Sequence, residues 1–322
     1  MNEITEMVLT GTGLVSAAGT AKKDFFKYLR RSSTCQEQRN GSKWLEAGQL
    51  LKHLEITEPK LKSARYMDPV SKNAIVAVGR AMTDAGLDEF QISADPYEYG
   101  IVLGTTRGAC VTREAVYGSL ASRRNKMMSG TLFSHCGYNI AGAMAAIAYG
   151  IKGPNITVAS REDLGLCILK RARQILMRGR AHTVFAGFTE CDGLSKRGSP
   201  LGEIAFVLCL ESKARAVARA AVALAEVRVQ DGERDDSRSV TGGVYGLQAR
   251  DPAQTQSAEA LSVSLPGLHA LSDRYRSLIL TAFLSHEPRL KDRFPAVAVA
   301  SGAGSNGALS QLLYPEEQHA AV

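Results

Sequence analysis

The 322-residue sequence has no pattern of metal or disulfide chemistry and is poor in aromatic residues. Its six cysteines are scattered, and no two stand in a CxxC pair or at another metal-ligand spacing. We therefore expect no metal site, and cysteines that are reduced core residues. Aromatic residues make up 6% of the chain. No module that interleaves basic and aromatic residues is found, so we expect no nucleic-acid partner.

Long apolar runs are also missing. The longest, around residues 140–151, is shorter than the roughly 20 residues that span a bilayer. The first residues, MNEI, are acidic and lead into a strand, which is unlike a signal peptide. These observations predict a cytoplasmic protein with no membrane partner.

The sequence has more basic than acidic residues. The formal net charge is +7, which suits an acidic partner. Basic residues gather at 60–65, 123–126 and 170–180. Such runs form either a solvated face or a docking surface for an acidic partner, and the sequence leaves both readings open.

Residues 152–187, KGPNITVASREDLGLCILKRARQILMRGRAHTVFAG, have the pattern of a βαβ unit. A Gly-Pro-Asn turn precedes a short β-prone stretch at 156–159. Apolar residues then recur at helical spacing, and basic residues collect before Gly179. Residues 184–187 return as a second buried strand.

Other segments have equally plain patterns. Asp68-Pro69 is a helix cap followed by an N1 proline. Residues 231–257 are polar and predict a loop. We expect further helices at 70–85, 111–120, 139–150, 212–219 and 266–283, and strands at 7–16, 99–103, 204–210, 221–229, 297–300 and 308–313.

Two stretches carry a family resemblance. Residues 8–16, VLTGTGLVS, fit a V-x-T-G-x-G-x-V-S pattern, and the Gly-Pro-Asn turn leads to the bend 160–165, SREDLG. The chain thus resembles the β-ketoacyl synthases, the thiolase-fold condensing enzymes. The resemblance implies an α/β, thiolase-like layered αβαβα fold with a shortened C-terminal half. It divides one globular subunit into an N-terminal half, 1–217, and a C-terminal half, 218–322.

The resemblance also shows which catalytic groups are missing. Glu162 stands where the family has its nucleophilic cysteine. A carboxylate cannot form and exchange the thioester that condensation needs. None of the six histidines stands in an H-G-T-G-T or G-H-x-x-G motif, and these motifs assist decarboxylation and stabilise the developing charge in the family. We therefore predict no catalytic residue, no condensing activity for the chain alone and no cofactor of its own.

Noncatalytic relatives with these features are the chain length factors of type II polyketide synthases. Resemblance to them implies a heterodimer with a catalytic ketosynthase, paired through Asn155, Ile156, Thr157 and Val158. It also implies an acyl carrier protein partner that carries the phosphopantetheine. The acyl tunnel is expected to be lined by Ala109, Thr112, Val116 and Phe133; the alternative is that the helix residues among them are ordinary core.

Other functions stay open at this point. The chain could be a malonyl carrier protein decarboxylase or an acyltransferase using Ser160, a stand-alone acyl-binding protein, or the chain length factor of an aryl polyene pathway. Glu162 either favours decarboxylation or compensates the dipole at a helix N-terminus. Residues 301–307 resemble a family glycine loop but lack its two aromatic residues.

Overall fold

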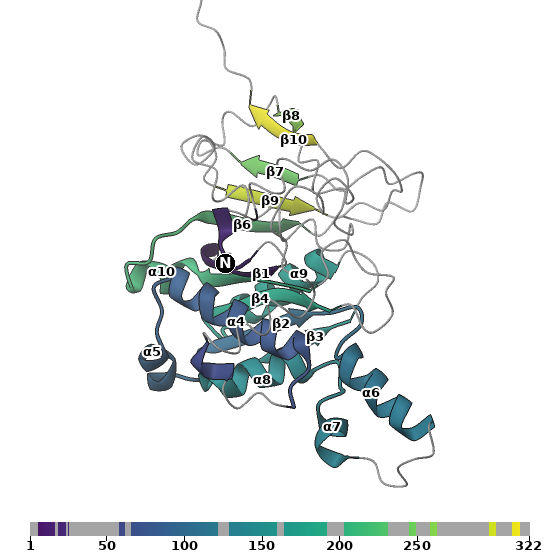
Figure 1. Cartoon of the computed structure of the whole chain (residues 1–322). Coiled ribbons are helices and arrows are strands. Elements are labelled where there is room, and N and C mark those ends of the chain that lie inside the picture. The colour runs from purple at the N-terminus through teal and green to yellow at the C-terminus, as the bar shows by residue number, and fades with distance from the viewer. Residues whose placement is uncertain are drawn as a thin grey trace, which may run out of the picture.

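The structure, a computed structural model, describes residues 6–16, 19–23, 25, 58–61, 66–121, 129–159, 164–191, 203–230, 245–248, 258–262, 296–300 and 311–315. These residues form one mixed sheet with helices on both of its faces (Figure 1). The expected α/β class is confirmed. No helix in these ranges is both long and apolar enough to cross a membrane.

The sheet has ten strands in the order β3-β2-β4-β5-β1-β6-β9-β7-β10-β8. In Figure 1 the labelled strands follow this order upward, from β3 in the lower half of the molecule to β8 near the top. Strands β3, β2 and β4 are parallel, and β4, β5, β1 and β6 pair antiparallel in turn. The strands are β1 Met7–Ser16, β2 Tyr99–Gly104, β3 Asn155–Val158, β4 Thr183–Glu190, β5 Ile204–Ser212, β6 Ala225–Gln230, β7 Tyr245–Gln248, β8 Ala258–Ser262, β9 Ala296–Ala300 and β10 Gln311–Pro315.

Helices cover the first five strands on both faces. Helices α4 and α8 pack on one face, and α9 packs on the other, where it contacts β2 and β4. The α6–α7 arm projects from the body near β3 (Figure 1). The helices are α4 Pro69–Asp84, α5 Glu89–Ala94, α6 Cys110–Ala121, α7 Gly130–Ser134, α8 Ile140–Tyr149, α9 Leu164–Met177 and α10 Lys213–Ala218, with a 3-10 turn at Pro59–Leu61.

Helix α4 begins where its cap residues predict. The Asp68 carboxylate accepts the backbone N–H of Val70 at 3.0 Å, and Pro69 occupies the first helical position. The helix backbone lies directly on β1. A Cβ added to Gly13 would stand 1.8 Å from the carbonyl oxygen of Ala77. The second glycine of the Thr-Gly-Thr-Gly stretch is therefore needed for this close approach.

The βαβ unit is confirmed. Strand β3, helix α9 and strand β4 follow one another, and β2 lies between the two strands. Leu164, Ile168, Ala172 and Leu176 are buried at the predicted helical spacing. The basic end of the helix is exposed at Arg178, which favours the solvated reading of this charge run.

Some predicted boundaries were wrong. Residues 231–257 contain β7, although a loop was predicted, and β4 continues to Glu190, beyond the predicted end at 187. Strand β8 and helix α5 were not predicted. The strands expected at 221–229, 297–300 and 308–313 appear as β6, β9 and β10. The helix expected at 266–283 and the glycine loop at 301–307 lie outside the described residues.

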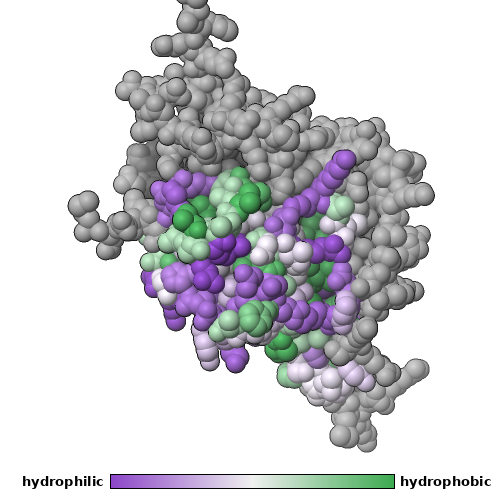
Figure 2. Space-filling view, turned by 90° about the vertical axis from the view of Figure 1, so that its left-hand side faces the viewer, coloured by the Kyte–Doolittle hydropathy of each residue, from purple (hydrophilic) through white to green (hydrophobic). Residues whose placement is uncertain are grey.

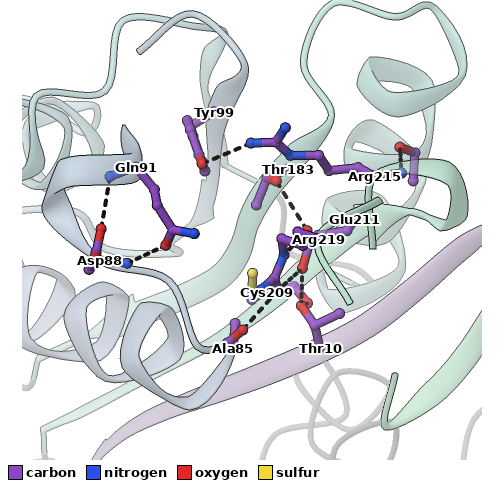
Figure 3. Close-up of polar contacts among 11 residues, drawn as sticks. Thr10, Ala85, Asp88, Gln91, Tyr99, Thr183, Cys209, Glu211, Arg215 and Arg219 are labelled. Carbon is purple, nitrogen blue, oxygen red and sulfur yellow. Dashed lines mark hydrogen bonds and ion pairs between the residues drawn. The ribbon is translucent and has the colours of Figure 1, made fainter. Parts of the chain in front are cut away.

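A buried ion pair joins α10 to the sheet (Figure 3). Glu211, at the end of β5, has no exposed side-chain surface, and both of its carboxylate oxygens accept from the Arg219 guanidinium, at 2.5 and 2.8 Å. Thr10 of β1 donates to the same carboxylate, and Arg219 also donates to the carbonyl of Ala85 after α4. The hydrogen bond with Glu211 raises the pKa of Arg219. The pair thus connects β5, β1 and the end of α4 at the start of the connection to β6.

Candidate functional site

The candidate site lies at the carboxyl ends of the parallel strands β2, β3 and β4, where α/β sheets commonly bind ligands. Strand β3 ends at Val158 and α9 begins at Leu164. A Cβ added to Gly104, the last residue of β2, would lie 2.5 Å from Ile168 and 2.9 Å from Leu164. This contact fixes the first turns of α9 on the sheet, close to the bend that precedes them.

Glu162 belongs to that bend. Residues 160–163, and therefore both Glu162 and Ser160, lie outside the described residues. The chain connects the bend to the end of β3 on one side and to the first turn of α9 on the other. A carboxylate there would be favoured by the helix dipole. The chemical role of Glu162 stays a prediction.

Three of the four predicted tunnel residues share one face at the start of α6. Ala109, Thr112 and Val116 are all buried, at helical spacing. The backbone N–H of Thr112 donates to the Asp68 carboxylate at 2.8 Å, so the cap of α4 also holds α6 in place. Phe133 is not brought to this face: it lies on α7 and is 56% exposed. That Ala109, Thr112 and Val116 line an acyl tunnel stays a prediction.

The predicted pairing strand lies at an edge of the sheet. β3 pairs with β2 and with no other described strand. Asn155 is exposed, and Ile156, Thr157 and Val158 are half-buried. Such an edge presents unpaired backbone N–H and C=O groups that suit a further strand.

Exposed apolar side chains also occur in the chain segment between β2 and β3. They come from α6, α7, the turn after α7 and α8, and we call this set of residues the apolar ridge: Tyr117, Leu120, Phe133, Tyr138 and Ile147. Ile147 is 71% exposed. The Arg113 guanidinium lies 5.1 Å from the centre of the Tyr138 ring, a cation–π contact that holds this part of the ridge.

Exposed apolar residues also lie on another face of the molecule. Figure 2 shows the face near α5 and α10, where hydrophobic residues lie in small areas between hydrophilic ones. Phe90 on α5 and Val217 on α10 are exposed there, at 82% and 71%. Apolar residues scattered in this way are normal for a protein surface.

Sequence reasoning missed a buried polar cluster at the same end of the sheet. Glu203 directly precedes β5, and its carboxyl lies beside Asn73 of α4. The Cys191 thiol, just after β4, lies 3.9 Å from Oε1 of Glu203, and the Cys110 thiol donates to the Cys191 carbonyl at 3.2 Å. The one signal in the sequence was a glutamate directly before an apolar strand, which gives no hint of its neighbours.

Burial is the main influence on the pKa values of the acidic groups in this cluster. Loss of solvation raises the pKa of Glu203, and the nearby Asp68 carboxylate raises it further; the polar side chains of Asn73 and Cys191 act in the opposite direction. Burial also raises the pKa of the Cys110 thiol. A raised pKa disfavours the thiolate, which is the nucleophilic form of Cys110. Across the described ranges, no three His, Cys, Asp or Glu side chains are grouped to hold a metal.

A sequence profile decides the family. The profile of "Beta-ketoacyl synthase, N-terminal domain" matches residues 5–198. The chain belongs to the β-ketoacyl synthase family. The matched residues include β1, the predicted tunnel helix α6, the predicted pairing strand β3 and the bend that holds Glu162.

Curated relatives of this β-ketoacyl synthase homologue are named as enzymes. The "3-oxoacyl-[acyl-carrier-protein] synthase 2" of Vibrio harveyi is 26% identical over 212 residues, which cover 62% of this chain and 48% of the relative. The protein of the same name from Staphylococcus aureus is 28% identical over 246 residues, covering 64% and 60%. The chain therefore spans about half to three-fifths of the length of these relatives.

Solved structures show the same fold. A type II polyketide synthase acyl carrier protein in complex with its ketosynthase bound to the hexaketide matches with a TM-score of 0.57, 18% identity, and coverage of 78% of this chain and 72% of that one. The ishigamide ketosynthase/chain length factor matches with a TM-score of 0.53, 20% identity, and coverage of 78% and 66%. The thiolase-like ketosynthase fold is thereby confirmed.

Proposed function

We propose that this chain is a noncatalytic β-ketoacyl synthase subunit that pairs with a catalytic ketosynthase, as the chain length factor of a type II polyketide synthase does. One observation carries the proposal: Glu162 occupies the position of the nucleophilic cysteine in the family motif. A carboxylate does not form the exchangeable thioester on which chain extension depends. The subunit's role is then to complete the heterodimer and to shape the acyl tunnel.

The edge strand and the apolar ridge support this pairing. An open strand edge and exposed aromatic and aliphatic side chains are each costly for a subunit that stays alone. A second subunit of the same fold can cover both features at once through a two-fold contact between equivalent strands. We place the contact at Asn155, Ile156, Thr157 and Val158 and along the ridge.

The acyl carrier protein is the second proposed partner. Among structures that share the fold, one holds a ketosynthase with its carrier protein and one is a ketosynthase/chain length factor. A net charge of +7 suits an acidic protein of this kind. In this proposal the phosphopantetheine stays on the carrier protein, and the chain itself needs no cofactor.

Co-purification tests the pairing. The chain is produced together with a tagged catalytic ketosynthase of a type II system, ideally one whose gene adjoins its own. We expect the two to elute as one complex. Ile147→Asp places a charge on the ridge and should abolish the complex. Phe90→Asp makes the same kind of change at a similarly exposed residue of α5 and should leave the complex intact. Equal loss with both variants, or no complex with the unaltered chain, contradicts the proposal.

Turnover tests the absence of catalysis. The purified chain alone is incubated with malonyl carrier protein, and carbon dioxide and acetyl carrier protein are measured. We expect no activity above that of the carrier protein alone. Activity that disappears in Glu162→Gln would make the chain a decarboxylase, and acyl transfer that disappears in Ser160→Ala would make it an acyltransferase.

A further inference from the structure

Three buried polar atoms have no hydrogen-bond partner among the residues that the structure describes: Oε2 of Glu203, directly before β5, and Oδ1 and Nδ2 of Asn73, on α4. Asn73 is fully buried in α4, and Glu203 is 9% exposed. The two side chains are close enough for the amide to influence the pKa of the carboxyl. Leaving a polar atom buried without a partner costs on the order of 1–3 kcal/mol, so three such atoms together call for a physical cause.

Counting donors and acceptors identifies what is missing. An ionised carboxylate only accepts hydrogen bonds. It could take a hydrogen from Nδ2 of Asn73, but Oδ1 of Asn73 would still have no donor. A neutral carboxyl group supplies that donor. The O–H at Oε2 of Glu203 then donates to Oδ1, and one proton satisfies both of these oxygen atoms. The other carboxyl oxygen, Oε1, is approached by the Cys191 thiol at 3.9 Å.

We propose that Glu203 carries a proton on Oε2 near neutral pH, and that its acid–amide pair with Asn73 is a pH-sensitive latch between the start of β5 and α4. The latch is closed while the proton is bound. When the proton leaves, the carboxylate and the amide oxygen are both acceptors and repel each other.

The surrounding charges favour the protonated form. Asp68, at the N-cap of α4, already places a carboxylate nearby, where backbone N–H groups of Val70 and Thr112 stabilise it at 3.0 and 2.8 Å. Burial raises the pKa of Glu203 most, and Asp68 raises it further. The Asn73 amide, the Cys191 thiol and Lys72 on the same helix lower it, and of these only the last two are smaller influences than Asp68. A second ionised carboxylate here would face Asp68 without solvent to screen it.

Opening the latch would affect more than β5. Because Asp68 also anchors the N-terminus of α6 through Thr112, a new charge beside it acts on the helix that carries Ala109 and Val116. The folded-state pKa of Glu203 is raised above its unfolded value. The latch therefore contributes stability fully below the ordinary Glu pKa of about 4.3, and this contribution is lost as pH rises through the raised pKa.

Infrared spectroscopy tests the proton directly. The full chain at neutral pH is expected to show the carbonyl stretch of a protonated carboxylic acid. The band should be absent from Glu203→Gln and retained in Glu89→Gln, an exposed glutamate on α5. It should also fade in the unaltered chain as pH rises. If the unaltered chain lacks the band at neutral pH, the proposal is overturned, and this reading needs no variant to fold.

Thermal unfolding tests the latch. The Glu203→Gln variant keeps a neutral group with a donor for Asn73, and this group cannot titrate. As pH rises from the unfolded pKa of about 4.3 to the raised pKa of Glu203, the unaltered chain should lose stability relative to the variant, by about tenfold in its folding equilibrium constant per pH unit. Above the raised pKa the loss should be complete, and the difference between the two proteins should no longer grow. Stability curves that run parallel over the whole range would overturn the latch.

Discussion

The turn after α10 places an alanine where the backbone favours glycine. Ala220 has a φ of 53°, and it is the one non-glycine residue with positive φ in the described part of the chain. Its N–H bonds to the carbonyl of Val217 at 3.0 Å, and that of Ala221 bonds to Ala216 at 2.8 Å. These two bonds are typical of a helix that ends in a left-handed residue. A Cβ in this conformation costs roughly 1–2 kcal/mol.

Replacing that alanine should stabilise the protein. Ala220→Gly removes the strained Cβ, while the unfolded chain gains some freedom. We expect the free energy of unfolding in urea to rise by roughly 0.5–1 kcal/mol. The control is Ala218→Gly at the exposed last residue of α10, which should lower it by up to about 1 kcal/mol. A decrease for both variants would show that the turn is not strained.

The residues of the buried latch illustrate the limit of sequence reasoning at this scale. Asp68 as a helix cap was predictable, because the cap and the N1 proline are adjacent in the sequence. The pairing of Glu203 with Asn73 was not, because it joins the start of a strand to a helix far earlier in the chain. Only the tertiary fold brings the two together.

At the scale of elements, the Glu211–Arg219 pair fastens α10 to the sheet. The glutamate is fully buried and the arginine nearly so. Arg219→Met leaves the carboxylate of Glu211 buried without its cation, and we expect a loss on the order of 3–5 kcal/mol in the free energy of unfolding. The control Arg178→Met, at the exposed residue that follows α9, should change it by less than about 0.5 kcal/mol.

A double variant separates the lost charge from the lost packing. Arg219→Met with Glu211→Leu removes both charges and should recover much of the stability that Arg219→Met loses, because well-packed apolar pairs often replace buried ion pairs without cost. Urea unfolding of the four proteins in the cycle gives the coupling energy. If the stability losses of the two single variants simply add up in the double variant, the ion pair does not stabilise the contact between α10 and the sheet.

Elements with a strong local pattern were predictable, and those that depend on partners were not. Helix α9 repeats apolar residues at its buried positions, so its sequence alone predicts it. Strand β7 lies in a polar region, and its pairing with β9 and β10 defines it. Helix α5 has only six residues; its capping box, Asp88 with Gln91 (Figure 3), was the overlooked signal.

At the scale of the whole molecule, the face at the start of α6 is where the proposed complex would set product length. Val116→Phe adds volume to this buried face beside Ala109 and Thr112. In a complex reconstituted with the ketosynthase and carrier protein, we expect products shorter by whole extension units, measured by mass spectrometry. Val217→Phe, exposed on α10, is the control. Unchanged products with an intact Val116→Phe complex would exclude this face from the tunnel.

The structure brings only three of the four predicted tunnel residues to one face, for a physical reason. Residues three and four apart on one helix share a face, so the grouping of Ala109, Thr112 and Val116 followed from spacing. Phe133 belongs to a separate helix, α7, and no periodicity fixes its direction relative to α6. The residues of the apolar ridge come from several elements, so no single local pattern in the sequence could predict them as a set.

The position of β1 has a consequence for synthesis of the chain. This strand lies between β5 and β6, and its partners follow about 200 residues later, as in the contact between Thr10 and Glu211. A ribosome that adds about 5–20 residues per second needs roughly 10–40 s to deliver them. For that time a ten-residue strand destined for complete burial has no partner to pair with. Nascent chains should therefore depend on chaperones, and slower translation should lower the soluble yield.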